Sequence, residues 1–132
     1  MDRKRALWDS MEKKPSLVII DDEESIATEL VGFFCDEGFD AYFATDGESG
    51  LELIKKIRPN VCLIDLKLPD MSGLLILKIA KENYPKTKII VNTGYVDQIL
   101  VDHARELKCD AFLHKPFDLI ELKQKIDALI AG

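Results

Sequence analysis

Short apolar runs alternate with longer amphipathic segments from Ser16 to the end of the chain. The first run, residues 17–20, is unbroken and β-branched, which is typical of a strand buried on both faces. Similar runs later in the chain predict four further strands, over residues 41–44, 61–64, 88–91 and 111–114. The segments between the runs are long enough to hold a helix each.

In those intervening segments, apolar residues recur every three or four positions, which is the period of a helix packed on one side. Boundary signals support this reading: Gly38 is a plausible end of the first helix, and Pro59 ends the second. Thr45 and Glu48 form a capping-box pattern, and Asp118 with Glu121 forms another. The pattern predicts helices from about Ile26 to Gly38, over 45–58, 74–83 and 96–107, and from Asp118 onward.

Five strands alternating with five helices indicate an α/β fold in which a parallel sheet is covered on both sides. Because such crossovers are right-handed, a doubly wound topology is expected. We expect this domain to span residues 16–131, after a charged extension over residues 1–15. Within the extension, Leu7, Trp8 and Met11 could share a helical face. It is either a solvated extension or a short helix that packs on the domain or on a partner.

The composition narrows the class of protein. A chain of 132 residues with 47% hydrophobic residues can build one core without metal or disulfide staples. A net charge of −6 argues against direct binding to nucleic acid, which favours a basic surface. Neither a signal peptide nor a membrane span is expected, so a cytoplasmic location is predicted. The three cysteines fit no disulfide or metal-ligand spacing and are expected to be buried or half-buried thiols.

Polar residues follow the predicted strands at their carboxyl ends, where open parallel sheets form their sites. Asp21 and Asp22 follow the first strand, Asp65 the third, Thr93 the fourth and Lys115 the fifth. Because these strand ends share one edge, the sequence predicts carboxylates, a hydroxyl and an ammonium group in a single site.

The chemistry of this group favours phosphoryl transfer. Neighbouring carboxylates repel one another unless protons or a cation neutralise them, and their oxygens suit a hard divalent ion, Mg²⁺ or Mn²⁺. A carboxylate can also attack phosphorus and form an aspartyl-phosphate. The metal and a nearby lysine would then stabilise the charge on the transferring group.

Four segments together resemble the signature segments of bacterial two-component response regulator receiver domains. They are residues 17–23, 64–73, 93–94 and 115–117, and they occur in the family's order and spacing. The resemblance covers residues 16–131. It implies a flavodoxin-like five-stranded parallel sheet in the order 2-1-3-4-5 with five flanking helices.

By this resemblance, Asp65 is the phosphoacceptor, which takes its phosphoryl group from a sensor histidine kinase or a phosphotransfer protein. Asp22 would bind Mg²⁺ directly and Asp21 through water, together with Asp65 and the backbone carbonyl of Lys67. Lys115 would pair with the phosphoryl group, and its peptide bond to Pro116 is expected to be cis.

The resemblance also implies a conformational switch. Thr93 would move toward the phosphoryl group, and Phe112 would turn inward as a hydrophobic group. The surface formed by residues 96–107, 111–114 and the start of the last helix is expected to change and to bind a downstream protein, an output domain or a second copy of the chain.

Two other functions remain open at this stage. The first is an aspartyl-nucleophile phosphatase on a related fold, which would carry a second aspartate two residues after the nucleophile on the first strand, where this chain has Glu23. The second is a receiver that has lost phosphorylation and only binds a partner. We expect the chain to catalyse no reaction beyond its own phosphorylation and dephosphorylation.

Overall fold

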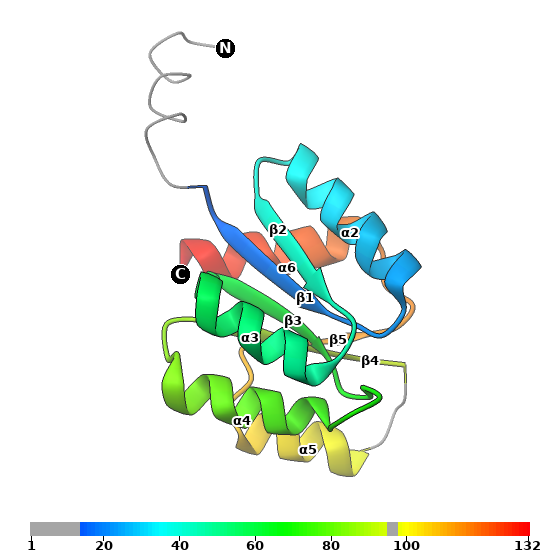
Figure 1. The fold of residues 1–132 in the computed structure, drawn as a ribbon, viewed down its shortest axis with the longest axis vertical. Coiled ribbons are helices and arrows are strands. Elements are labelled where there is room, and N and C mark those ends of the chain that lie inside the picture. The colour runs from blue at the N-terminus through cyan, green and yellow to red at the C-terminus, as the bar shows by residue number, and fades with distance from the viewer. Residues whose placement is uncertain (1–13, 95–97) are drawn as a thin grey trace, which may run out of the picture.

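The fold confirms the predicted doubly wound sheet. The computed structural model describes residues 14–94 and 98–132. The extension that holds Trp8, predicted as either solvated or a short helix, and the start of the predicted 96–107 helix lie outside these residues. The five strands are parallel and lie in the order β2-β1-β3-β4-β5 (Figure 1). Their bounds are β1 (Ser16–Ile20), β2 (Asp40–Ala44), β3 (Val61–Asp65), β4 (Lys88–Thr93) and β5 (Ala111–His114).

The helices of the described residues cover both faces of the sheet (Figure 1). They are α2 (Glu24–Asp36), α3 (Gly47–Ile57), α4 (Gly73–Asn83), α5 (Gln98–Glu106) and α6 (Leu119–Ala131). Residues of α2 and α6 form one hydrophobic core with alternate strand residues, including Leu63 and Ile90. Residues of α3, α4 and α5 form the second core with the strand residues between these, including Ile64 and Val91. No helix among the described residues is long and apolar enough to cross a bilayer.

The two central strands β1 and β3 are buried along their whole length, as their unbroken apolar runs predict. Each is therefore held by packing on both faces as well as by hydrogen bonds to both neighbours. The residues that follow β1 and end β3 thus start from the most constrained part of the molecule.

The helix starts agree with the sequence patterns in one case and differ in another. Asp118 caps α6 as predicted, because its carboxylate accepts a hydrogen bond from the Glu121 N–H at 2.7 Å. The cap of α3 is Asp46, not Thr45, and it accepts from the Ser49 N–H at 2.7 Å. The prediction was off by one residue because two adjacent side chains can both cap, and the carboxylate does so here.

The prediction for the cysteines is partly wrong. Cys62 is buried in β3 and Cys109 is half-buried, but Cys35 is exposed on α2. Burial raises the pKa of the Cys62 thiol far above its ordinary value, so this group stays protonated.

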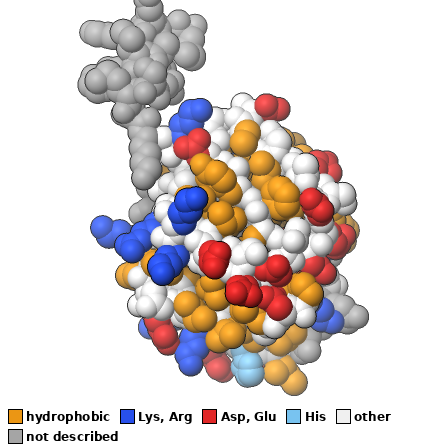
Figure 2. Space-filling model, in the orientation of Figure 1, with side chains coloured by type: hydrophobic (Ala, Val, Ile, Leu, Met, Phe, Trp, Pro, Cys, Tyr) orange, Lys and Arg blue, Asp and Glu red, His pale blue; other side chains and the backbone are white. Residues whose placement is uncertain are grey.

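Charged side chains differ between the two ends of the sheet. Lys55 and Lys56 lie in the last turn of α3, and Lys81 lies in the last turn of α4, at the end where the strands begin. The acidic side chains that follow β1 and end β3 lie at the opposite end. On the face of the molecule that Figure 2 shows, most visible Lys and Arg side chains (blue) lie on one side and most Asp and Glu side chains (red) lie on the other.

Candidate functional site

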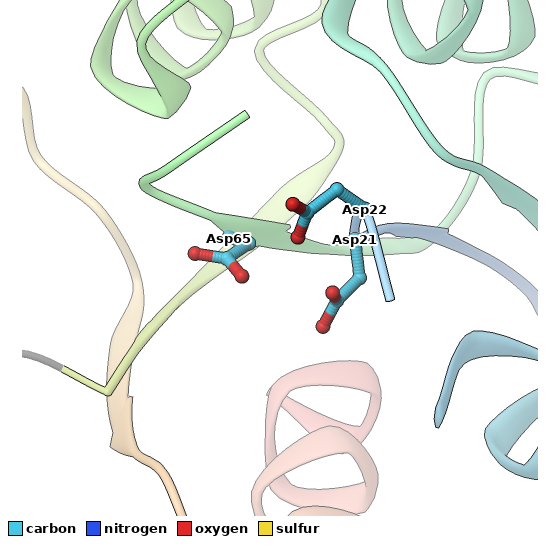
Figure 3. A group of neighbouring side chains, drawn as sticks. All are labelled: Asp21, Asp22 and Asp65. Carbon is cyan, nitrogen blue, oxygen red and sulfur yellow. The ribbon is translucent and has the colours of Figure 1, made fainter. Parts of the chain in front are cut away.

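Three aspartates meet at the carboxyl edge of the sheet. Asp21 and Asp22 follow β1, and Asp65 ends the neighbouring strand β3 (Figure 3). Each offers a carboxylate oxygen that lies within 4.8 Å of the other two. Asp21 and Asp65 are buried, whereas Asp22 is exposed. The sequence analysis predicted this grouping, and the three oxygens could hold a divalent cation.

Lys115 contacts two of these aspartates although it comes from the edge strand of the sheet. It follows β5, and its Nζ atom lies 2.9 Å from Asp21 Oδ2 and 3.0 Å from Asp65 Oδ2. A longer contact of 3.5 Å reaches Glu23 Oε1. The structure therefore brings the predicted ammonium group to the predicted carboxylates. The Lys115–Pro116 peptide bond is cis, as expected.

Burial and hydrogen bonds act in opposite directions on these charges. Burial raises the pKa of Asp65, and hydrogen bonds from the Lys67 N–H and from Lys115 offset only part of that effect. For Lys115, burial alone would lower the pKa, but the hydrogen bonds to Asp21 and Asp65 outweigh burial and the pKa is raised. Lys115 is thus a cation at neutral pH, and burial destabilises the charged form of the neighbouring Asp65 carboxylate.

Several hydrogen bonds hold the loop between β3 and α4 in place. The Lys67 N–H donates to Asp65 Oδ1 at 3.0 Å, and the Gly73 N–H donates to the Leu66 carbonyl at 2.9 Å. Farther along the loop, Asp70 accepts hydrogen bonds from the Gly47 and Glu48 N–H groups, at 2.7 and 3.0 Å. These contacts hold the backbone around Lys67 next to Asp65.

Two further predicted residues are Thr93, at the carboxyl edge of the sheet, and Phe112, on the face covered by α3, α4 and α5. Thr93 ends β4, is buried, and accepts a hydrogen bond from the Lys115 N–H through its carbonyl at 3.0 Å. Phe112 is half-buried and packs against the core formed with α3, α4 and α5. Its ring lies 4.9 Å from that of His114, so these two side chains share a face. By strand alternation Lys115 points to the other face.

The sequence predicted no role in the site for three residues that lie at it or beside it. Asp70 bonds to helix α3, which is 22 residues away along the chain, and no local pattern announces such a contact. Glu23 lies near Lys115 across the sheet, so its contact is also non-local. Asn92 directly follows the apolar run 89–91 within β4, and a polar residue before Thr93 was the available signal.

An open parallel sheet with acidic side chains and a lysine at its carboxyl edge places the chain among the flavodoxin-like α/β proteins. Residues 17–127 match the response regulator receiver domain family. The chain belongs to this family and is a receiver domain of the two-component response regulator type.

Characterised relatives differ in how much of their length the chain covers. It is 31% identical over 110 residues to sporulation initiation phosphotransferase F of Bacillus subtilis, covering 83% of this chain and 89% of that protein. It is 37% identical over 109 residues to the regulatory protein AtoC of Escherichia coli, covering 80% of this chain but 23% of AtoC. The chain thus spans about a quarter of AtoC and most of the phosphotransferase.

Solved structures show the same arrangement. A CheY-like response regulator receiver domain protein from Methanospirillum hungatei superposes with a TM-score of 0.82 at 29% identity, covering 89% of this chain and 97% of that one. The receiver domain of the Francisella response regulator 1452 gives a TM-score of 0.81 at 27% identity, with 89% and 98% coverage.

Proposed function

We propose that this receiver domain is a phosphorylation switch whose acceptor is Asp65. The observation that carries the proposal is the placement of the Asp65 carboxylate between Lys115, at 3.0 Å, and two further aspartates within 4.8 Å. The donor would be the phosphohistidine of a sensor histidine kinase or of a phosphotransfer protein. An Asp65 oxygen forms the new bond to phosphorus, the histidine nitrogen–phosphorus bond breaks, and the released imidazole takes up a proton.

The residues around Asp65 support this transfer in distinct ways. The Lys67 N–H fixes one oxygen of the Asp65 carboxylate, so the nucleophile is oriented before the donor arrives. Lys115 supplies a positive charge that remains through the neutral pH range, and it can pair with the incoming phosphoryl oxygens. The Thr93 hydroxyl lies at the same edge and would donate to a phosphoryl oxygen after the transfer.

The donor set fits Mg²⁺, or Mn²⁺, as the cofactor. Ligand oxygens of octahedral Mg²⁺ stand roughly 3 to 4.2 Å apart, because each lies about 2.1 Å from the ion. The oxygens of Asp21, Asp22 and Asp65 lie within 4.8 Å of one another, so small side-chain movements would bring them to that spacing. The Lys67 carbonyl would be a further ligand. When bound, the cation would offset the negative charge of the carboxylates and the phosphoryl group.

The surface formed by α5, β5 and the start of α6 would transmit the signal. Phosphorylation replaces the single negative charge of the Asp65 carboxylate by the roughly −1.5 to −2 charges of a phosphoryl group, and Thr93 and Phe112 would respond by changing position. Two large apolar side chains on this surface, Ile99 and Ile120, are 67% and 69% exposed. Such side chains support binding of a downstream protein, an output domain or a second copy of the chain. By analogy with its family, the switch would act in the cytoplasm and without direct contact to nucleic acid or membrane.

Phosphorylation by a small phosphodonor tests the proposal directly. Incubation with acetyl phosphate and Mg²⁺ should add about 80 Da, the mass of one phosphoryl group, to the intact protein. Asp65→Asn should abolish the gain. Asp36→Asn, at an exposed carboxylate in the last turn of α2, serves as the matched control and should be modified like the native chain. A native chain that stays unmodified while folded would instead support a receiver that only binds a partner.

Metal binding has a separate readout that needs no phosphodonor. A cation that binds only the folded protein stabilises it by RT ln(1 + [Mg²⁺]/Kd), about 1.4 kcal/mol at ten times Kd. Urea unfolding with and without Mg²⁺ should show this gain in the native chain. Asp22→Asn should lose most of it, because Asp22 offers one of the clustered oxygens. An equal gain in both proteins would contradict the assignment of Asp22.

We also propose that the domain is not an enzyme for other substrates. An aspartyl phosphatase is less well supported, because the residue two positions after Asp21 is Glu23, which contacts Lys115 at 3.5 Å. Release of phosphate from an added phosphomonoester, dependent on Asp21 and not on Asp65, would favour the phosphatase.

A further inference from the structure

Asn92 is a buried polar residue that the proposed function does not use. It lies in β4, its side chain is almost fully buried, and the residue is 1% exposed. Within the described ranges 14–94 and 98–132, its side-chain Oδ1 atom has no hydrogen-bond partner. A buried carbonyl without a partner costs free energy that an apolar side chain of similar size would avoid.

Strand alternation places the Asn92 side chain on the face that also carries the reactive groups. Ile90, two residues earlier in β4, belongs to the core formed with α2 and α6, whereas Val91 belongs to the other core. Asn92 therefore points to the α2 and α6 face. In β3 the register partner of Asn92 is Asp65, which follows Leu63 on the same face by the same alternation.

The Lys115 side chain has to cross β4 to reach its partners. It starts beyond the end of β5, and its ammonium contacts Asp65 on β3 and Asp21 after β1. Strand β4 lies between β5 and β3, and neighbouring strands are about 4.8 Å apart. On this face, the last side chain that β4 presents is Asn92. The unpartnered carbonyl of Asn92 thus belongs to the strand that the Lys115 side chain crosses, on the same face of the sheet, and the Lys115 ammonium carries three hydrogen-bond donors.

We infer that Asn92 is a positioning residue for Lys115, whose ammonium its side-chain carbonyl accepts when Asp65 becomes phosphorylated. This inference rests on the proposed function. In the unmodified protein, the Asp21 and Asp65 carboxylates hold the ammonium at 2.9 and 3.0 Å, and the more exposed Glu23 carboxylate lies at 3.5 Å. Phosphorylation converts the Asp65 carboxylate into an acyl phosphate, whose carboxyl oxygens carry no charge and whose phosphoryl oxygens carry the negative charge. The Asn92 carbonyl then supplies a buried, neutral acceptor in place of the long contact to Glu23, and it keeps Lys115 at the site while Lys115 pairs with the phosphoryl group.

An isosteric pair of variants separates this role from simple packing. Asn92→Thr and Asn92→Val have nearly the same shape and both suit a strand, but threonine keeps a hydroxyl acceptor. The rate of phosphorylation by acetyl phosphate with Mg²⁺ should fall about 10- to 100-fold in Asn92→Val, as expected for the loss of one hydrogen bond to a charged group. Asn92→Thr should stay at least three times faster than Asn92→Val. Ile90→Val, one pleat earlier on the same face, should react like the native chain.

The outcomes distinguish the two proposals. Equal rates for Asn92→Thr and Asn92→Val, whether slowed or not, would overturn the role of Asn92 and leave Asp65 as the acceptor. A native chain that is never modified would overturn both. Urea unfolding of the unmodified proteins adds a second readout: Asn92→Val should be at least as stable as the native chain, because it removes an unpartnered carbonyl. A less stable valine variant with the rate of the threonine variant would show a packing role alone.

Discussion

Replacement of Gly73 by alanine probes how closely helix α4 approaches the proposed acceptor. Gly73 is the first residue of α4 and is buried. A Cβ atom at this position would lie 2.3 Å from the Asp65 carbonyl oxygen and 2.8 Å from the Leu66 Cα atom. Contacts of a Cβ below 3.0 Å are essentially absent from proteins, so the helix start and the end of β3 must separate by at least 0.7 Å, from 2.3 to 3.0 Å.

The cost of that separation follows from which atoms collide. Both neighbours are backbone atoms of the central strand and its following residue, so they have no rotamer by which to move away. Overpacking typically costs about 1–3 kcal/mol, and the better helix propensity of alanine offsets at most about 1 kcal/mol. We therefore expect Gly73→Ala to lower the free energy of unfolding by about 1–2 kcal/mol.

The matched control is Gly32→Ala in the interior of α2. A Cβ at Gly32 would meet nothing within 4 Å, and the residue is exposed. Here only helix propensity changes, so this variant should gain about 0.5–1 kcal/mol. Two chemically identical substitutions are thus expected to have opposite signs in urea unfolding.

The same displacement should affect phosphorylation. A shift of the Asp65 backbone moves the carboxylate relative to Lys115 and the other aspartates, and misplacement on the order of 1 Å can reduce a rate about 100-fold. We expect Gly73→Ala to react with acetyl phosphate at least about 10-fold more slowly, and Gly32→Ala to react normally. The reasoning about close approach is refuted if Gly73→Ala is as stable and as reactive as the native chain.

Substitutions at three further positions test contacts near the site, a helix cap and the core. Asp70→Ala should destabilise the protein at neutral pH. Hydrogen bonds from the Gly47 and Glu48 N–H groups lower the pKa of Asp70. The contribution of Asp70 to the free energy of unfolding is therefore complete above about pH 4, and it is lost as the pH falls through the folded-state pKa. Urea unfolding at several pH values should show that the stabilities of the two proteins converge in acid. Asp118→Ala removes the cap of α6 and should cost about 1 kcal/mol, whereas Asp118→Ser should retain most of it. Leu77→Ala empties a fully buried position of the core beneath α4 and should cost about 2–5 kcal/mol, and a loss below 1 kcal/mol would contradict the packing described.

Hydrophobic periodicity predicted the elements well, because each strand and helix buries a continuous stripe. The run 17–20 and the residues Ile26, Leu30 and Phe34 mark β1 and α2 without any tertiary information. Polar strand ends were harder: β4 extends to Thr93, past the predicted end at residue 91, because Asn92 and Thr93 are buried although they are polar. The strand order was implied by resemblance and not by periodicity, since periodicity carries no information on which strands pair.

The residues of the candidate site that end or follow a strand were predicted from the sequence. Asp21, Asp22, Asp65 and Lys115 follow apolar runs, so the fold alone brings them to one edge. The residues that contact the site from other parts of the chain were not predictable in the same way. Asp70 binds a helix start that is far away in the sequence, and such contacts depend on the final packing of two segments. The burial of Asn92, whose Oδ1 atom has no hydrogen-bond partner among the described residues, is likewise set by tertiary structure.

The unequal charge of the two ends of the sheet gives the domain an orientation in an electric field. Lys55 and Lys56 at the end of α3 stand opposite the aspartates of the carboxyl edge, so charge is unevenly distributed along the strands, although the net charge is −6. A protein with a basic surface would be turned toward the aspartates before contact, which raises the encounter rate and makes it fall with added salt. Neutralisation of that edge by a cation would weaken this steering, so occupancy of the metal site would also influence how fast partners arrive.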